Sequence, residues 1–210
     1  MALRTPDGLI LEARVSEPST SRGGVVVCHP HPLYGGDMDN PVVVRATDVC
    51  ADLGLATLRF NFRGVGGSTG THGRGIAERI DVESALDHLR VALADDGGVA
   101  LVGYSFGALV VAHVAPGRPE LAGLCLIAPP LGFAGASLPP ALATFSGPLC
   151  VVAGTGDEYC PAAALDSLRE VLPGAQVTVV ESANHFFFGK FFPLGEAIAT
   201  WARAAFPRQE

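Results

Sequence analysis

The chain has 210 residues, of which 49% are hydrophobic and 17% charged, and its 21 acidic and 14 basic residues give a net charge of −7. This length and apolar content predict a single domain over residues 1–210 with a sizeable core. No apolar run is long enough to cross a membrane, and no basic stripe carries interleaved aromatic residues. These features exclude a membrane-spanning protein and disfavour nucleic acid as a partner.

Short apolar runs alternate with helical segments along the chain. After an extended segment at residues 9–15, strands are predicted at residues 24–29, 56–62, 98–104, 122–128, 148–153 and 176–181. Helices are predicted at residues 40–53, 75–94, 105–115, 161–172 and 189–206. This alternation predicts an α/β fold, with a mostly parallel central sheet that helices cover on both faces. The loops that follow the strands should then meet at one edge of the sheet.

The loop after the first buried strand carries two histidines, His29 and His31. An H-x-H pair at the end of a strand can hold a metal ion, but the interleaved prolines argue against a regular strand, and no other ligand motif accompanies the pair. The glycine-rich segment 64–70 misses a dinucleotide-binding pattern by one position and is better interpreted as a loop that lines the site. The sequence therefore predicts neither a metal ion nor a cofactor.

Residues 103–107 read Gly-Tyr-Ser-Phe-Gly, directly after the apolar run 99–102 and before a helical segment. A serine in such a G-x-S-x-G motif sits on a sharp turn between a strand and a helix, and the glycines leave room for the strained backbone. Ser105 is therefore the candidate nucleophile. The N–H of the next residue, Phe106, is the expected first donor to an oxyanion.

Two later loops supply the partners that such a serine needs, in the order nucleophile, acid, histidine. Asp157 follows the strand 148–153 and a Gly-Thr-Gly turn, with its neighbour Glu158 as a rival for the same role. His185 follows the strand 176–181. A neutral imidazole can take the serine proton, and a carboxylate on its other nitrogen holds the ring in place, so these three residues predict nucleophilic catalysis.

Two segments are His-Pro-His-Pro-Leu-Tyr-Gly-Gly-Asp-Met-Asp-Asn at 29–40 and Phe-Asn-Phe-Arg-Gly-Val-Gly-Gly-Ser at 60–68. Both segments resemble the α/β-hydrolase superfamily, in particular small lidless bacterial hydrolases related to carboxylesterases and dienelactone hydrolases. The resemblance runs from the first buried strand to the final helix. It implies a second oxyanion donor in the loop after that strand. This donor is His31, although Pro30 stands where many relatives have glycine and leaves Leu33 or Tyr34 possible.

Only residues 131–147 separate the fourth and fifth predicted buried strands, too few for a cap domain with its own core. We therefore expect an open site, with Leu33 and Tyr34 beside the substrate. The predicted function is a serine hydrolase, and specifically a carboxylesterase that acts on small-molecule esters with short or exposed acyl groups. A thioesterase, a peptidase or a lactone hydrolase would use the same residues, and an inactive scaffold is the contrasting class.

The cysteines and the N-terminus favour a cytoplasmic protein. The five cysteines show no C-x-x-C spacing, and no apolar stretch follows a basic segment at the start of the chain. Cys28, Cys125 and Cys150 fall within apolar strands and are expected to be buried. Cys160, beside the predicted acid loop, could be exposed enough to react.

Overall fold

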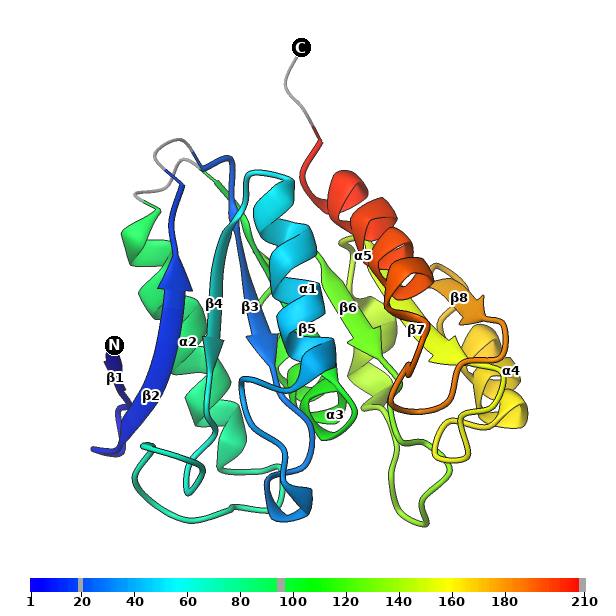
Figure 1. Cartoon of the computed structure of the whole chain (residues 1–210), viewed down its shortest axis with the longest axis horizontal. Helices are drawn as coiled ribbons and strands as arrows, with labels where there is room; N and C mark the ends of the chain where they lie inside the picture. Colours follow the sequence, from blue (N-terminus) through cyan, green and yellow to red (C-terminus); the bar gives the residue numbers. More distant parts are fainter. Residues whose placement is uncertain (19–20, 94–96, 208–210) are drawn as a thin grey trace.

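The computed structural model describes residues 1–18, 21–93 and 97–207 (Figure 1). In this part of the chain, eight strands form one sheet in the order β1-β2-β4-β3-β5-β6-β7-β8. The strands are β1 (Ala2–Arg4), β2 (Ile10–Ser16), β3 (Gly24–Cys28), β4 (Ala56–Phe60), β5 (Val99–Tyr104), β6 (Leu124–Ile127), β7 (Leu149–Gly154) and β8 (Gln176–Val180). The helices are α1 (Pro41–Asp52), α2 (Glu78–Ala92), α3 (Phe106–Val114), α4 (Ala162–Val171) and α5 (Phe191–Ala205).

The strands from β3 onward pair in parallel, whereas β2 pairs antiparallel with both β1 and β4 at one edge of the described sheet. This arrangement confirms the mostly parallel sheet predicted from the sequence. Every residue of β3, β5, β6 and β7 is buried, as expected for strands covered by helices on both faces. The short strand β1 was not predicted, because three residues give no periodic signal.

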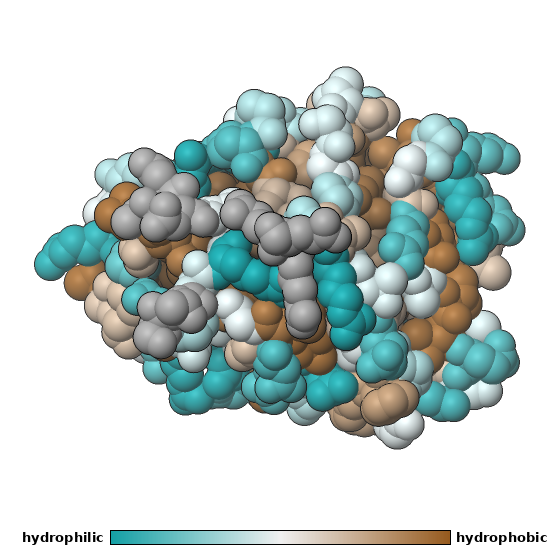
Figure 2. All heavy atoms as spheres, turned by 90° about the horizontal axis from the view of Figure 1, so that it is seen from above, coloured by the Kyte–Doolittle hydropathy of each residue, from teal (hydrophilic) through white to brown (hydrophobic). Residues whose placement is uncertain are grey.

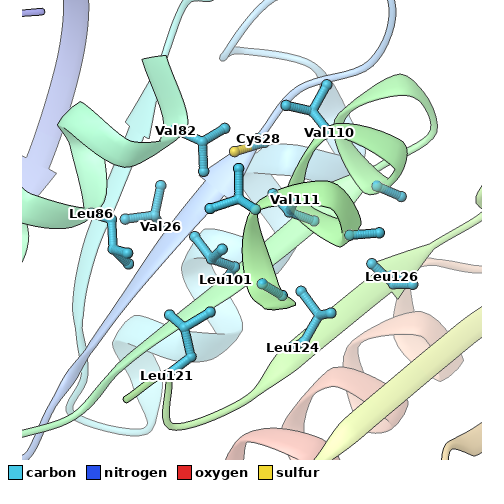
Figure 3. Close-up of a cluster of buried hydrophobic side chains, with 14 of the residues drawn as sticks. Val26, Cys28, Val82, Leu86, Leu101, Val110, Val111, Leu121, Leu124 and Leu126 are labelled. Atoms are coloured by element: carbon cyan, nitrogen blue, oxygen red, sulfur yellow. The ribbon is translucent and has the colours of Figure 1, made fainter. Parts of the chain in front are cut away.

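Helices α2, α3 and α4 cover one face of the sheet, and α1 and α5 cover the other (Figure 1). The alternation of side chains along β3 supplies both cores: Val26 faces α2 and α3, whereas Val25 and Val27 face α1 and α5. Figure 3 shows the first core, where Val26 and Leu101 from the strands lie near Leu86 of α2. Burial of each such side chain stabilises the fold by about 1.5–3 kcal/mol.

Helix α1 begins where the sequence predicts, at an asparagine followed by a proline, whereas α2 begins later than predicted. The Asn40 side chain accepts a hydrogen bond from the Val42 N–H at 3.0 Å, with Pro41 as the first helical residue. Helix α2 begins at Glu78, because Gly75 adopts a φ of +80° that ends helical geometry before it. Its last described helical residue is Ala92, and the predicted end at residue 94 lies outside the described residues.

The segment between β6 and β7 consists of turns and one short 3-10 helix (Pro140–Thr144), and it forms no cap, as predicted. The carboxyl ends of the parallel strands lie at the lower edge of Figure 1 and leave the loops of that edge uncovered by such a domain. Figure 2 shows the opposite end, where polar and apolar residues are intermingled. Among the residues described, no helix has the length and apolar character to cross a membrane.

Candidate active site

Ser105 occupies a strained turn between β5 and α3. Its φ of 54° and ψ of −115° lie outside the conformations common for a residue with a side chain. Its N–H donates to the Ile127 carbonyl of the neighbouring strand at 2.8 Å, which holds the turn in place. A Cβ on Gly103 would collide with the Gly107 backbone, and one on Gly107 would lie 2.6 Å from the Cys28 carbonyl oxygen. Both glycines are therefore needed for this turn.

The three residues proposed from the sequence lie in one hydrogen-bonded series. The Ser105 Oγ lies 3.0 Å from His185 Nε2, and His185 Nδ1 lies 3.0 Å from each carboxylate oxygen of Asp157. All three residues are buried. The rival Glu158 is exposed to solvent and makes no such contact among the described residues. The structure thus brings Asp157, and not Glu158, to the histidine.

Backbone contacts hold the acid and the histidine in these positions. Asp157 Oδ1 accepts hydrogen bonds from the N–H groups of Tyr159 and Cys160 at 2.9 and 3.0 Å. The Tyr104 hydroxyl donates to the His185 carbonyl at 3.1 Å, and burial raises the pKa of Tyr104, so the hydroxyl stays a donor. This role of Tyr104 was not predicted from the sequence, although its place inside the G-x-S-x-G motif was a usable signal.

The loop after β3 packs against the helix that follows the serine turn. His31 precedes the short 3-10 helix Pro32–Tyr34, and its ring lies 4.9 Å from the Phe106 ring. The Leu33 N–H donates to His31 Nδ1 at 3.2 Å, and the Tyr34 N–H donates to the His31 carbonyl at 3.1 Å. The N–H groups of Leu33 and Tyr34 thus have acceptors inside the loop, and no hydrogen bond of the His31 N–H occurs among the described residues.

The first residue of a helix has no carbonyl acceptor within that helix for its N–H. Phe106 holds this position in α3, immediately after Ser105. Tyr34 is 87% exposed and lines the cavity above Ser105, whereas Leu33, 70% exposed, is not among the residues that line it. Of the two residues expected beside a substrate, the cavity lining thus includes Tyr34 and not Leu33.

His29 is fully buried and structural. Its Nε2 accepts a hydrogen bond from the Phe62 N–H at 2.9 Å, and its Nδ1 lies 2.7 Å from the Pro30 carbonyl oxygen, which requires the proton on Nδ1. Both ring nitrogens are therefore occupied. Among the described residues, no group of three or more His, Cys, Asp or Glu side chains is placed to hold a metal ion.

Burial lowers the pKa of His29 from 6.5 to about 4, and this shift predicts a pH-dependent stability. As pH falls from 6.5 to 4, the unfolded chain binds a proton at His29 that the folded chain does not, so folding is destabilised in that window. The expected loss is about 2.5 kcal/mol between pH 7 and 4.5. Urea unfolding at both pH values measures it, and His29→Gln should lose less stability on acidification. An equal loss in both proteins would contradict the assignment.

Cys160 is not the reactive thiol that the sequence suggested. The residue is 1% exposed, and burial, with a smaller effect of the nearby Asp157 carboxylate, raises the pKa of the thiol to about 12. The acid loop curls inward here, because the Cys160 N–H donates to Asp157. Cys28, Cys125 and Cys150 are fully buried, as predicted.

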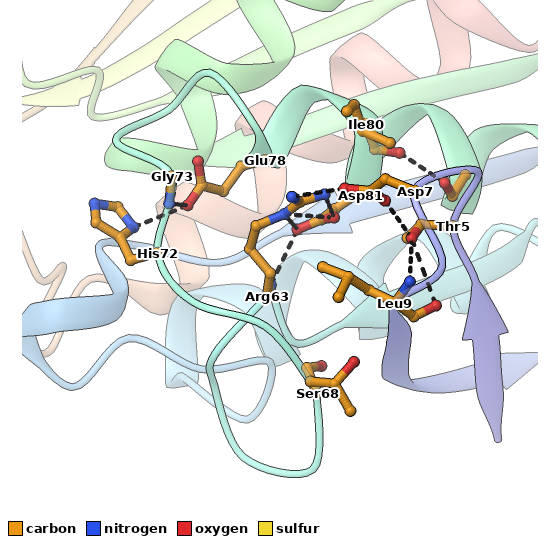
Figure 4. A network of polar contacts seen from close by, with 12 residues as sticks. Thr5, Asp7, Leu9, Arg63, Ser68, His72, Gly73, Glu78, Ile80 and Asp81 are labelled. Carbon is orange, nitrogen blue, oxygen red and sulfur yellow. Dashed lines mark hydrogen bonds and ion pairs between the residues drawn. The ribbon is translucent and has the colours of Figure 1, made fainter.

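A network of buried charges fixes the glycine-rich loop beside the site (Figure 4). The Arg63 guanidinium binds both carboxylate oxygens of Asp81, with distances from 2.7 to 3.1 Å. The fully buried Glu78 accepts hydrogen bonds from the N–H groups of Gly73 and Gly75 at 2.6 and 2.8 Å. The helical pattern of the sequence does not predict that these carboxylates are buried.

The segment 64–70 does not line the cavity, contrary to expectation, whereas residues that follow it in the chain do.

A cavity of about 970 Å³ opens at Ser105. Its walls come from the loops after β3, β4, β6, β7 and β8 and from α3, all at the same edge of the sheet. Residues from these elements include Pro30, His31, Tyr34, His72, Arg74, Gly75, Arg79, Phe106, Leu109, Val110, His113, Phe133, Tyr159, His185 and Phe186. The His185 ring contacts the Tyr159 ring edge-on, with centroids 4.7 Å apart, and Tyr159 stacks on Phe133 at 5.2 Å.

Residues 25–191 match the model of the alpha/beta hydrolase domain, and the chain belongs to this family. It is 32% identical over 200 residues to an uncharacterized protein of Rickettsia prowazekii, which covers 92% of this chain and 84% of that protein. A putative alpha/beta hydrolase from Agrobacterium tumefaciens superposes with a TM-score of 0.87 at 31% identity, over 97% of this chain and 94% of that one.

A lidless α/β serine hydrolase from Xanthomonas campestris superposes with a TM-score of 0.85 at 30% identity, over 100% of this chain and 95% of that chain. The family match and these two structures confirm the α/β-hydrolase fold without a lid. They also place the chain among hydrolases.

Proposed function

We propose that this chain is a serine hydrolase, and specifically a carboxylesterase that works through an acyl-enzyme on Ser105. The observation that carries this proposal is the series of hydrogen bonds from Asp157 through His185 to Ser105, each of 3.0 Å. The strained turn under the serine and the position of Phe106 at the start of α3 support the same mechanism. The similarity to a lidless serine hydrolase agrees with it.

In this mechanism, the Ser105 Oγ attacks the acyl carbonyl of the ester while His185 Nε2 takes its proton. The Nδ1–H stays hydrogen-bonded to Asp157, whose carboxylate stabilises the imidazolium. The carbonyl oxygen becomes an oxyanion and accepts hydrogen bonds from the N–H groups of Phe106 and His31. His185 then gives its proton to the leaving alcohol, the acyl-enzyme remains, and water attacks it by the same route in reverse.

The open cavity favours substrates with short or exposed acyl groups. The loops around Ser105 are not covered by a cap, so a long alkyl chain would remain largely in contact with water. An apolar group of moderate size gains contact with the aromatic wall at Phe133 and Tyr159, which lies beside His185. A thioester, an amide or a lactone would react with the same groups, and these alternatives are separated by substrate tests.

Hydrolysis of p-nitrophenyl esters from acetate to decanoate tests this proposal. We expect turnover that is highest for chains of up to about six carbons, because a longer chain gains little further burial in an open cavity. A maximum at decanoate would contradict an open acyl site. No turnover of any ester by a protein that still reacts with a fluorophosphonate would exclude the carboxylesterase and leave a hydrolase for another acyl group.

A further inference from the structure

The cavity at Ser105 collects basic side chains in an acidic protein. The chain has 21 acidic residues, and none of those described lines this cavity. Two arginines, Arg74 and Arg79, and four of the six histidines do line it. A cavity with walls of one charge sign and a low-dielectric floor concentrates ligands of the opposite charge. The distribution therefore points to an anionic group on the ligand.

The two arginines stand at the edge of the cavity that borders α3. Arg79 lies in the first turn of α2, is half-buried, and its Nε donates to the Gly75 carbonyl at 3.1 Å. A Cβ on Gly75 would lie 3.5 Å from the Phe106 ring, so this segment packs beside the residue that follows Ser105. Arg74 is exposed on the same segment. Neither arginine forms an ion pair within residues 1–18, 21–93 and 97–207.

One face of α3 forms the floor between Ser105 and this basic edge. Phe106, Leu109, Val110 and His113 line the cavity and share the spacing of a single helical face. The floor is apolar for its first three residues and spans about 10 Å from Phe106 to His113. The His113 Nδ1 lies 2.9 Å from the Leu109 carbonyl oxygen, so its Nε2 is directed away from the helix backbone. A short alkyl chain fits this floor.

Two acidic side chains near this edge, Glu78 and Asp81, already bind partners within the protein. Glu78 is fully buried and accepts hydrogen bonds from the Gly73 and Gly75 N–H groups, with His72 Nδ1 2.9 Å from its Oε1. Asp81 is fully buried and binds Arg63. These two carboxylates hold the loop from below and do not reach the cavity surface. Arg74 and Arg79 are thus the permanently charged residues among those that line the cavity.

We propose that the preferred substrates of this site are esters whose acyl chain ends in a carboxylate, which Arg79 binds together with Arg74. This inference rests on the proposed esterase function. The acyl side is assigned because His185 must protonate the leaving oxygen, which places the leaving group beside Tyr159 and Phe186. The acyl chain then extends from the oxyanion donor Phe106 along α3. A guanidinium group matches a carboxylate with paired hydrogen bonds.

A matched pair of esters tests this selectivity. The esters p-nitrophenyl hydrogen adipate and p-nitrophenyl hexanoate have the same chain length, and only the first ends in a carboxylate. We expect kcat/KM of the wild-type protein to be about 10- to 100-fold higher for the adipate ester, from charge-assisted hydrogen bonds, after subtraction of spontaneous hydrolysis. Arg79→Gln should remove most of this preference, chiefly through a higher KM for the adipate ester, so the ratio of kcat/KM for the two esters is the readout. Arg203→Gln, at an exposed site on α5, is the matched control.

The outcomes separate this proposal from the esterase function itself. Equal kcat/KM for both esters, with turnover lost in Ser105→Ala, would overturn the carboxylate site and leave the serine hydrolase standing. A higher kcat/KM for 4-carboxyphenyl hexanoate, which carries the charge on its leaving group, than for p-nitrophenyl hydrogen adipate would overturn the acyl-side assignment. If neither ester is hydrolysed, calorimetric titration of Ser105→Ala with both esters decides. Tighter binding of the adipate ester that Arg79→Gln abolishes supports the site, and equal binding overturns it.

Discussion

Replacing Ser105 with alanine is expected to lower kcat for p-nitrophenyl butyrate by a factor on the order of 10⁶. The hydroxyl is the atom that forms the acyl-enzyme, and no other nucleophile takes its place when it is removed. The oxyanion donors and the cavity remain, so a residual rate above the uncatalysed reaction should persist. Steady-state hydrolysis with the purified variant measures this loss.

The structure provides a control for this experiment. Ser167 is an exposed serine on α4, and Ser167→Ala should keep wild-type activity. Ser105→Ala should also keep its fold, because within the described residues the Ser105 side chain makes a hydrogen bond to His185 alone, and circular dichroism can check this. Retention of more than a tenth of the wild-type kcat by Ser105→Ala would contradict Ser105 as the nucleophile.

Asp157→Asn is expected to lower kcat by about 10⁴-fold, a smaller effect than that of Ser105→Ala. The carboxylate moves no proton in the reaction. It holds the His185 ring with Nδ1 protonated and stabilises the imidazolium, and an amide at this position favours the other tautomer. Because Asp157 Oδ1 also accepts two backbone N–H groups of its own loop, the substituted oxygen can still hold that turn.

Glu158→Gln is the matched control for this change, since it removes the same charge from the next residue along the chain. Glu158 is exposed, and we expect its substitution to change kcat by less than about twofold, as for surface charges in general. If Glu158→Gln is the damaging substitution and Asp157→Asn is active, then Glu158 is the acid of the working enzyme. That result would also mean that the loop after β7 rearranges.

The buried strands and the residues after them could be predicted from the sequence, because both depend on local patterns. The strand β5 is a continuous apolar run, and the glycines on either side of Ser105 mark the turn that ends it. Asp157 and His185 could be placed from their positions just after predicted strands. Parallel strands deliver their carboxyl ends to one edge, so chain order alone was enough to bring these three residues together.

Other features depend on contacts between distant segments, which no local pattern records. The sequence left open whether Cys160, beside the acid loop, is exposed, whereas in the structure it is buried and its N–H donates to the Asp157 carboxylate. Glu78 begins an amphipathic helix, where a carboxylate normally faces water, yet it is fully buried under the loop that it holds. The basic edge formed by Arg74 and Arg79 could not be predicted from the sequence. Only the folded structure shows that both arginines line the cavity and that none of the described acidic residues does.

Mass spectrometry after reaction with a fluorophosphonate is the most direct test of Ser105 as an activated nucleophile. The proposed mechanism predicts one adduct per chain, on the peptide that contains Ser105, with no adduct in Ser105→Ala and much slower labelling in His185→Ala. The wild-type protein should lose its esterase activity in proportion to labelling. An adduct on a different residue, or an unlabelled wild-type protein that still folds, would contradict the account.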